Sequence, residues 1–279
     1  MTRSSRPPQG IQSLETGGGL LHALVARSGP TMLKTLAADA AMPPAKARRY
    51  LVSFMRLGLV EQDPATGWYE LGPFALHIGL AAIARIDAIR LAAPLMADLA
   101  RRLDTTIAAA VWGNRGPTIV RWEESAQVVI VYLRAGAVMP LISSAIGRCF
   151  AAWMPQAQVA PLLDVELVAA GRARRRGVPG TRRGFDALMK SVRDDGMARA
   201  EGTLLPGISA VACPVFDHRG DMVLALSALG YAGSFDARTD ALPARSLREA
   251  SQALSSRLGA RPRRVGAVPV PIAAPGRGE

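Results

Sequence analysis

The sequence predicts an α+β protein with two domains: an N-terminal winged helix-turn-helix domain and a C-terminal α/β domain with a largely antiparallel sheet. Three observations predict this fold. Two short helical patterns, separated by a Pro-Pro pair, precede a hairpin pattern over residues 31–72. The hydrophobic period then changes from helical to alternating after Thr105. Finally, two strong strand patterns flank a turn at residues 217–220, and helical patterns surround these strands on both sides.

The first domain depends on a helix pair over residues 31–57. The first helical pattern ends at the Pro-Pro pair, because proline lacks an N–H and disfavours a helical conformation in the residue before it. Pro44 can open the next helix, where its missing donor costs little. That second helix, residues 44–57, has one apolar face that can pack on the first helix. Lys46, Arg48 and Arg49 lie on or beside the opposite face, open to a partner.

A hairpin follows the second helix. Gly58 predicts a helix end, and the strand-like residues 59–61 and 68–71 flank turn residues at 63–67. This layout is that of a winged helix-turn-helix, whose second helix enters the major groove of DNA while the wing lies along the phosphates. The residues expected to contact double-stranded DNA are Thr31, Pro44, Ala45, Lys46, Arg48 and Arg49, and Thr31 is also expected to cap the first helix of the pair.

The alternative is that the basic residues form an ordinary solvated face of a helix pair. The wing favours DNA binding, because a hairpin directly after the helix has no obvious role in building a core. The formal charge of the 279-residue chain, +12, also suggests a polyanionic partner. However, residues 1–79 hold eight basic and five acidic side chains. Much of the excess lies in the C-terminal tail and in residues 171–183, for which a solvated loop is favoured over a second DNA contact.

Composition also limits the location of the chain. No run of 18 or more apolar residues free of charge occurs, so a membrane-spanning helix is not expected. The N-terminus lacks the apolar core of a secretory signal. Two cysteines make no disulfide framework and fit a reducing compartment. We therefore predict a cytoplasmic protein with no membrane partner.

The chain divides into five predicted segments: a disordered arm (1–9), the winged helix-turn-helix domain (10–72), a linker and dimerisation helix (73–90), the second domain (91–259) and a disordered tail (260–279). In the first domain, glycines 17–19 predict a late start or a frayed first turn for the helix at 11–26. In the second domain we expect helices at 92–103, 141–153, 161–170, 184–195 and 237–258, and strands at 106–112, 118–122, 128–133, 197–200, 208–216 and 222–229.

The helix at 141–153 opens with Ser143, Ser144, Ala145 and Ile146, which offer hydroxyl and N–H groups. A helix N-terminus carries about half a positive charge, which suits a carboxylate. Trp112 and Trp122 are candidates for walls around an aromatic ligand, although a tryptophan on a strand more often belongs to the core. Arg121 and Arg148 are possible carboxylate partners, with surface ion pairing as the favoured alternative for each.

Catalysis has little support. The three histidines are scattered, and they form no metal-ligand spacing with Cys149 or Cys213. Both cysteines lie on apolar faces and are expected to pack in the core. No nucleophile elbow occurs. The sequence therefore predicts no enzyme, no catalytic residue, no metal and no cofactor.

Four segments together resemble the IclR-type transcriptional regulators: IQSLETGGGLLHALV, LAADAAMPPAKARRYLVSFMRLGLVEQDPATGWYELGP, MPLISSAIGRCFAAWMP and EGTLLPGISAVACPVFDHRGDMVLALSALG. The resemblance covers residues 11–258 in order. It implies a winged helix that binds operator DNA as a dimer, often with two dimers in a tetramer. It also implies a C-terminal GAF-like domain that binds a small effector, commonly a carboxylic acid, with Ser209 and Ser227 lining the cavity.

The segment AVWGNRGPTIVRWEES is similar to family members associated with aromatic-compound catabolism. Two positions depart from the family pattern. Ala45 stands where a hydroxyl is frequent at the start of the recognition helix, and Ile146 stands where a smaller residue is frequent in the effector segment. We therefore expect altered DNA specificity, with Lys46 and Arg48 compensating, and a reshaped pocket.

The sequence thus favours an effector-responsive, homo-oligomeric regulator. Two alternatives remain open: an architectural DNA-binding protein without a ligand, and an enzyme acting on a small acid. The identity of the effector, the operator and the direction of regulation are not specified by these patterns.

Overall fold

The structure is a computed structural model that describes residues 10–27, 29–84, 87–124 and 133–261. Contacts divide the chain after residue 86 into two compact units, and each has hydrophobic clusters of its own. We call them the N-terminal unit and the effector unit, the second after the effector-binding domain that the sequence predicts. The predicted arm (1–9), nearly all of the predicted tail (260–279) and most of the strand predicted at 128–133 lie outside the described residues.

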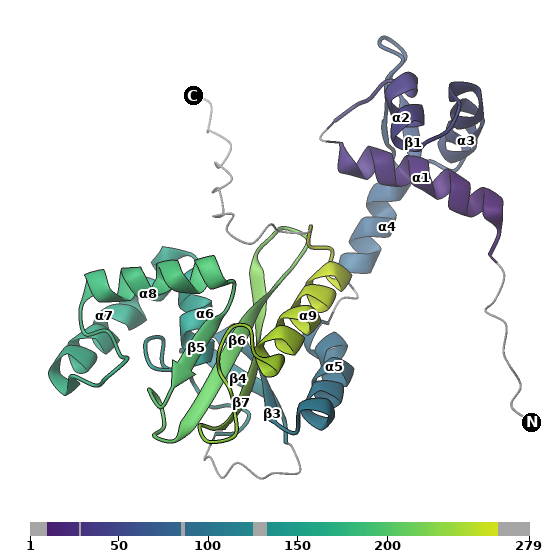
Figure 1. Cartoon of the computed structure of the whole chain (residues 1–279). Helices are drawn as coiled ribbons and strands as arrows, with labels where there is room; N and C mark the ends of the chain where they lie inside the picture. The colour runs from purple at the N-terminus through teal and green to yellow at the C-terminus, as the bar shows by residue number, and fades with distance from the viewer. Residues whose placement is uncertain (1–9, 28, 85–86, 125–132, 262–279) are drawn as a thin grey trace, which may run out of the picture. The chain divides into compact units, whose positions relative to one another are not determined.

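The N-terminal unit has the element order predicted for a winged helix-turn-helix (Figure 1). Pro44 is the first residue of its third helix, and Pro43 precedes it in an extended conformation (ψ 142°) that a residue before proline favours. The elements are α1 (Gln12–Ala26), α2 (Leu33–Asp39), α3 (Pro44–Arg56), the antiparallel strands β1 (Val60–Gln62) and β2 (Tyr69–Leu71), and α4 (Pro73–Ala84).

The glycines of α1 serve close packing. The predicted late start or frayed turn is wrong, because α1 is helical from Gln12 through all three glycines. A Cβ added to Gly17 would lie 2.9 Å from Cδ1 of Tyr50 and 3.1 Å from Cζ of Phe54, both on α3. Glycine at this position therefore lets α3 pack directly against α1. Helix α1 contacts both α2 and α3.

The segment predicted as one linker helix at 73–90 contains two helices. Helix α4 ends at Ala84, and α5 (Ala88–Leu103) begins with its own cap: the Asp87 carboxylate accepts the N–H groups of Ile89 and Arg90, both at 3.0 Å. An aspartate in an extended conformation caps the start of a new helix. The apolar pattern at 73–90 therefore does not form one continuous helix.

The effector unit contains one five-stranded sheet in the order β4-β3-β7-β6-β5. All neighbouring strands pair antiparallel, as predicted. The strands are β3 (Thr106–Gly113), β4 (Gly116–Glu123), β5 (Ala198–Glu201), β6 (Ile208–Phe216) and β7 (Met222–Tyr231).

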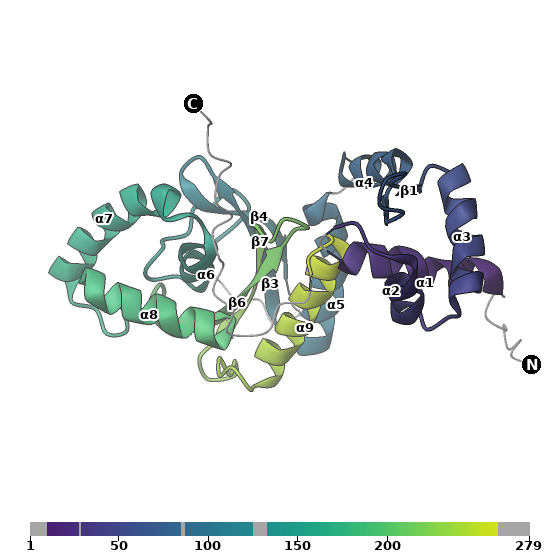
Figure 2. The same cartoon turned by 90° about the horizontal axis from the view of Figure 1, so that it is seen from above.

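Helices cover both faces of this sheet (Figures 1 and 2). One face packs against α5 and α9 (Leu242–Arg257), and the other packs against α6 (Ala145–Trp153). Helices α7 (Gln156–Ala173) and α8 (Arg182–Asp195) follow on the α6 side. Strand alternation explains the two cores: along β3, Ala108 and Ala110 join the cluster under α6, while Ile107 and Ala109 join the cluster under α5 and α9. Among the described residues no helix is long and apolar enough to span a membrane.

Candidate functional site

Helix α3 presents a basic face to solvent. Ala47 and Leu51 are fully buried and fix the rotation of the helix on α1 and α2. As a result the predicted DNA-contacting residues of α3 are all exposed: Pro44, Ala45, Lys46, Arg48 and Arg49. Within the part of the chain that the structure describes, none of the three basic side chains forms an ion pair. This face can therefore approach phosphates or base edges without first breaking a contact.

Thr31 does not cap α2, contrary to the prediction. The N-cap position is Met32, and it makes no side-chain cap. The Thr31 hydroxyl instead donates to the carbonyl of Gly29 at 3.0 Å, and its backbone pairs with Tyr69 in both directions at 2.9 Å. Thr31 is 8% exposed because this bridge ties the start of α2 to the wing strand.

The turn of the wing is internally bonded. The Asp63 carboxylate accepts the N–H of Ala65 at 2.7 Å, and this bond lowers the pKa of Asp63. Gly67 closes the turn with a positive φ of 72°, and its N–H donates to the Asp63 carbonyl at 2.8 Å. The side chain of Trp68, beside this turn, is exposed. These bonds give the turn of the wing a fixed shape.

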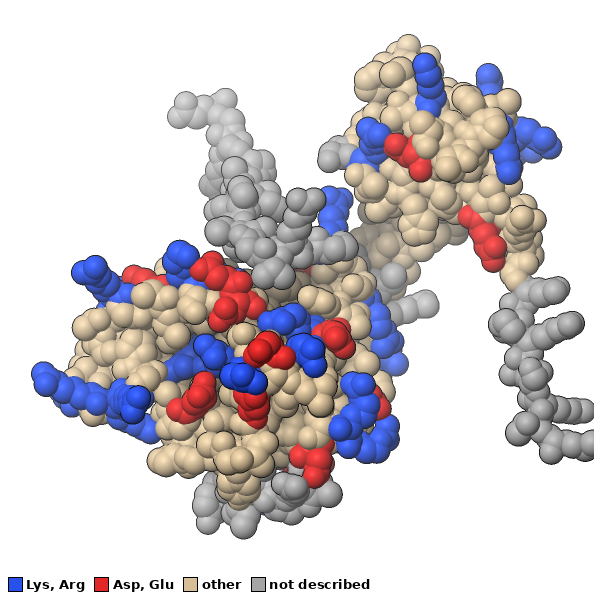
Figure 3. Space-filling view, in the orientation of Figure 1, with Lys and Arg blue, Asp and Glu red and all other residues tan. Residues whose placement is uncertain are grey.

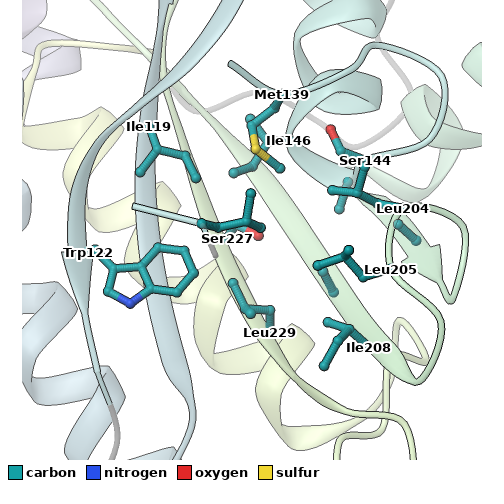
Figure 4. Close-up of a pocket in the computed structure, with 14 residues that line it drawn as sticks. Ile119, Trp122, Met139, Ser144, Ile146, Leu204, Leu205, Ile208, Ser227 and Leu229 are labelled. Atoms are coloured by element: carbon teal, nitrogen blue, oxygen red, sulfur yellow. The ribbon is translucent and has the colours of Figure 1, made fainter. Parts of the chain in front are cut away.

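The effector unit contains a cavity of about 40 Å³ between the sheet and α6. This volume is below that of typical small-molecule sites, so a ligand of several carbon atoms would have to move the lining side chains apart. Trp122 and Ile119 lie across from Leu204 and Leu205, with Ser227 between them (Figure 4). The lining is otherwise apolar, apart from the start of α6, and consists of Ile119, Trp122, Leu133, Met139, Ser144, Ala145, Ile146, Ala200, Leu204, Leu205, Ile208, Ala210, Ser227 and Leu229.

The polar end of the cavity is the first turn of α6. Ser144 is the N-cap: its Oγ accepts the N–H of Gly147 at 2.8 Å and donates to the carbonyl of Pro140 at 2.6 Å. The Ser144 hydroxyl therefore has no further proton to donate to a ligand. The N–H groups of Ala145 and Ile146 have no hydrogen-bond partner among the described residues, as expected for the first turn of a helix. These two backbone donors, with the helix dipole behind them, suit an anionic group.

Two charged side chains, the half-buried Glu166 and the buried Arg148, hold the loop that precedes α6. The Glu166 carboxylate, on α7, accepts the N–H of Leu141 at 2.8 Å and of Ile142 at 2.9 Å. The Arg148 guanidinium, on α6, donates through Nε to the Ile142 carbonyl at 2.7 Å and through Nη2 to the Gly177 carbonyl at 2.7 Å. Its Nη1 donates to the carbonyl of Arg199 on β5. Arg148 thus joins the loop before α6 to the segment between α7 and α8.

Burial shifts the pKa values of both groups. It raises the pKa of Glu166, although the two backbone N–H bonds oppose the shift. It lowers the pKa of Arg148 to about 10, with a smaller effect from Arg199 in the same direction. Arg148 nevertheless stays cationic at neutral pH, and three carbonyl dipoles compensate its charge.

The structure brings five of the eight predicted effector residues to the cavity: Trp122, Ser144, Ala145, Ile146 and Ser227. Ser143, Ser209 and Trp112 are absent from the lining. The Ser143 carbonyl accepts from Thr203 Oγ1 at 2.6 Å. Trp112 packs on Phe150, with ring centroids 5.9 Å apart.

Ser209 faces the opposite side of the sheet from Ser227. In the β6–β7 register Ala212, not Ser209, lies opposite Ser227, and Ser209 is three positions before Ala212 along β6. Side chains alternate along a strand, so the two serines cannot point into one cavity. The Ser227 hydroxyl, in turn, already donates to the Val211 carbonyl at 2.8 Å.

The favoured surface role holds for Arg121 and is wrong for Arg148. Arg121 forms an ion pair with Glu123 at 2.7 Å. Arg148 is 5% exposed and binds only main-chain carbonyls. Sequence reasoning also missed Glu166, which is one of two carboxylates, with Asp164, in an otherwise largely apolar helical stretch.

No catalytic constellation emerges from the described residues. They hold no group of three or more histidine, cysteine or carboxylate side chains that could bind a metal ion. Cys149 and Cys213 are free and buried, and burial raises the pKa of Cys213 to about 12. A buried thiol with a raised pKa is a poor nucleophile.

Comparison with known proteins gives a consistent result. The model of the "IclR helix-turn-helix domain" matches residues 13–64, and that of the "Bacterial transcriptional regulator IclR C-terminal" matches residues 80–256. The chain is 24% identical over 272 residues to the transcriptional repressor AllR of Salmonella typhimurium (strain LT2), covering 93% of this chain and 97% of that protein. It is 29% identical over 262 residues to the glycerol operon regulatory protein of Streptomyces griseus, covering 90% and 97%.

Solved structures share the fold. Pseudomonas aeruginosa HmgR aligns with a TM-score of 0.81 at 36% identity, covering 90% of this chain and 99% of that one. An IclR homologue from Microbacterium hydrocarbonoxydans, complexed with 4-hydroxybenzoate, aligns with a TM-score of 0.53 at 19% identity, covering 88% and 98%. The curated relatives are regulators, in agreement with the prediction that this chain is not an enzyme. The chain belongs to the IclR family of DNA-binding transcriptional regulators.

Proposed function

We propose that the chain is an operator-binding regulator whose DNA affinity is controlled by a small carboxylic acid bound at the start of α6. The observation that carries the proposal is the start of α6: two backbone donors without a partner among the described residues border a small apolar cavity of about 40 Å³. An apolar cavity with one anion-binding end suits an aromatic or aliphatic carboxylate. The solved relative complexed with 4-hydroxybenzoate supports this class of ligand.

The DNA contact is assigned to Lys46, Arg48 and Arg49 on α3. An arginine can bind guanine O6 and N7 together, and such a pair discriminates a base by about 1–3 kcal/mol. We expect Arg49→Gln to weaken operator binding about 5- to 150-fold. Lys46→Gln should weaken binding to all duplexes alike and reduce the salt slope by about one unit. Anisotropy titration of fluorescent duplexes, enriched from a random library by the wild-type protein, measures both effects.

Arg90→Gln is the matched control for this experiment. Arg90 is an exposed arginine of the effector unit, so its substitution removes the same charge from a residue outside α3. It should leave the affinity for the enriched duplexes within about twofold of the wild type, since salt screens a single exposed charge that makes no DNA contact. Equal losses for Arg49→Gln and Arg90→Gln would refute the assignment to α3.

The carboxylate site is tested by removing one backbone donor. Ala145 is the first residue of α6, where proline is well tolerated, and Ser144 before it has the extended conformation (φ −103°, ψ 149°) that proline requires. Ala145→Pro should therefore fold normally and lose the stabilisation by an acid. A ligand at 100 times its Kd stabilises the folded state by about 2.7 kcal/mol. A thermal-shift screen of aromatic and aliphatic acids, including 4-hydroxybenzoate, gives the readout.

Gln156→Pro is the matched control, because Gln156 is likewise the first residue of a helix, α7, and follows an extended residue. It should retain the full thermal shift. An acid that stabilises Ala145→Pro as strongly as the wild type binds elsewhere and contradicts the proposed site. If no acid stabilises the wild type, the alternative of a ligand-independent architectural DNA-binding protein gains support.

Control of DNA binding follows from linkage. If the acid prefers one arrangement of the regulator and operator DNA prefers another, each ligand lowers the affinity for the other by the same factor. The proposal therefore requires that a saturating operator duplex change the Kd for the acid. An unchanged Kd would refute control by the effector while leaving both binding sites in place.

Self-association is proposed through α4. Phe74, Leu76, Ile78 and Leu80 are between 47% and 61% exposed, and the helix carries no charged residue. Such an apolar helix marks an interaction surface. We expect the double substitution Leu76→Asp and Leu80→Asp to convert a dimer or tetramer into smaller species in sedimentation velocity. Leu242→Asp, at an equally exposed leucine on α9, should not. An unchanged sedimentation coefficient for the double variant would exclude α4 as the interface.

A further inference from the structure

We propose that the effector unit carries a second DNA-binding surface, which contacts the phosphate backbone of duplex DNA beside the site that α3 occupies. This surface, which we call the arginine surface, consists of the end of α7, the segment after it and the start of α8. Its residues are Arg172, Arg174, Arg175, Arg176, Arg182 and Arg183. In Figure 3 basic side chains gather at the end of this unit where α7 and α8 lie. The inference rests on the proposed function of α3.

The arginine surface has a large uncompensated charge. No acidic residue occurs between Glu166, which faces inward onto the loop before α6, and Asp186. All six arginines are exposed. Arg182 has acidic partners, Asp186 at 3.3 Å and Asp164 at 3.9 Å. The other five have no ion pair among the described residues, so they repel one another until a polyanion binds.

The segment that carries these arginines is held in place, unlike a freely solvated loop. The Gly177 carbonyl accepts from the buried Arg148 at 2.7 Å. The backbones of Gly171 and Gly180 touch, since a Cβ on Gly180 would lie 2.8 Å from Cα of Gly171. Thr181 caps α8 by accepting the N–H of Gly184 at 3.2 Å. A backbone fixed in this way loses less entropy when its side chains bind a ligand.

The C-cap of α7 is also an arginine, although its backbone conformation is one that favours glycine. Arg174 is the residue that closes the helix, with φ 44° and ψ 45° in the left-handed region. Glycine is the usual residue there, because it has no Cβ. In this chain the position is an arginine, which adds a cation between Arg172 and Arg175.

Duplex DNA is the partner that this charge pattern fits. Phosphate contacts need cations and no particular side-chain pocket, and the arginine surface offers cations without an apolar centre. Because the same chain binds DNA through its N-terminal unit, the effector unit would meet the flanking duplex at an effective concentration that can reach the millimolar range. Individually weak phosphate contacts of the arginine surface are then enough to add measurable affinity for the flanking duplex.

The test compares two duplexes with the full-length protein. One is the short duplex enriched by the wild type, and the other carries about two extra helical turns, about 20 base pairs, on each side. We expect the wild type to bind the extended duplex with a steeper salt dependence, by about 0.9 unit per contacted phosphate. The variant with Arg172, Arg174, Arg176 and Arg183 changed to Gln should lose this extra slope and keep its affinity for the short duplex.

A control variant that loses the same number of charges shows whether the effect depends on where the arginines lie or on net charge alone. Changing Arg90, Arg115, Arg245 and Arg257 to Gln removes four exposed arginines elsewhere on the effector unit. This variant should keep the extra slope, and both variants should match the wild type in thermal unfolding. The proposal is overturned if the wild type shows no extra slope, if both variants lose it equally, or if the arginine-surface variant keeps it. Loss of short-duplex binding by Arg49→Gln alone tests the α3 assignment independently.

Discussion

Replacing Arg148 with methionine should lower the free energy of unfolding of the effector unit by about 3–5 kcal/mol, because three main-chain carbonyls lose their charged hydrogen-bond donor. Methionine fills much of the same volume, but it leaves the carbonyls of Ile142, Gly177 and Arg199 without their donor. Each unsatisfied buried carbonyl costs about 1–3 kcal/mol. Urea unfolding followed by tryptophan fluorescence measures the change, because three of the four tryptophans, Trp112, Trp122 and Trp153, lie in this unit.

Arg199→Met is the control for this substitution. Its side chain is 41% exposed and its ion-pair distance to Glu201 is 3.9 Å, so its removal should cost less than about 1 kcal/mol. Arg148→Lys should fall between the two, because a lysine ammonium cannot reach three separated carbonyls in the geometry of a guanidinium. Equal stability of Arg148→Met and Arg199→Met would show that the network does not hold the loop before α6.

Replacing Gly147 with alanine should cost about 1–3 kcal/mol of stability, as overpacking does, and should also weaken binding of the acid. A Cβ at this position would lie 1.9 Å from the Pro140 carbonyl oxygen and 2.6 Å from Cα of Leu141. Both are main-chain atoms, so the loop must move. That movement disrupts the Ser144 cap, whose bonds go to Gly147 and Pro140 themselves. Calorimetry of the variant, with and without the acid identified by the screen, measures both losses.

Gly18→Ala makes the same chemical change inside α1. An added Cβ there meets no atom within 4 Å, so alanine should stabilise the protein by about 0.5–1 kcal/mol through helix propensity. Opposite signs for the two variants would show that contact at Gly147, and not glycine replacement as such, causes the loss. A stabilising Gly147→Ala would contradict the tight approach of the loop to α6.

Local sequence patterns were sufficient to predict helix starts and the central strands. The Pro-Pro pair predicted the start of α3 to the residue, because proline acts on its own backbone and on the residue before it. The predicted strands β3, β6 and β7 also match, since a short apolar run bounded by turn residues is a local feature of the sequence. The opening of α6 was found because a helix start is a local feature.

The wrong or missing predictions concern side chains whose contacts are distant in the sequence. Assigning Ser209 and Ser227 to one cavity required the register of β6 on β7, which a turn and a long pairing set together. The role of Arg148 depends on carbonyls up to 51 residues away. Glu166 lies 24 and 25 residues after the N–H groups it accepts. No periodicity in the sequence encodes such contacts, so a charged residue in an apolar helix was the only available signal.

The way the cavity is built has a consequence for how ligand preference can diverge among related regulators. The end that we propose binds the anion consists of main-chain N–H groups, which nearly every substitution preserves, whereas its walls consist of side chains such as Trp122, Leu204 and Ile208. Mutation can therefore reshape the walls for a new carbon skeleton without losing the means to hold an acid. Recognition of the functional group is inherited with the fold, and selectivity for the rest of the molecule is free to change.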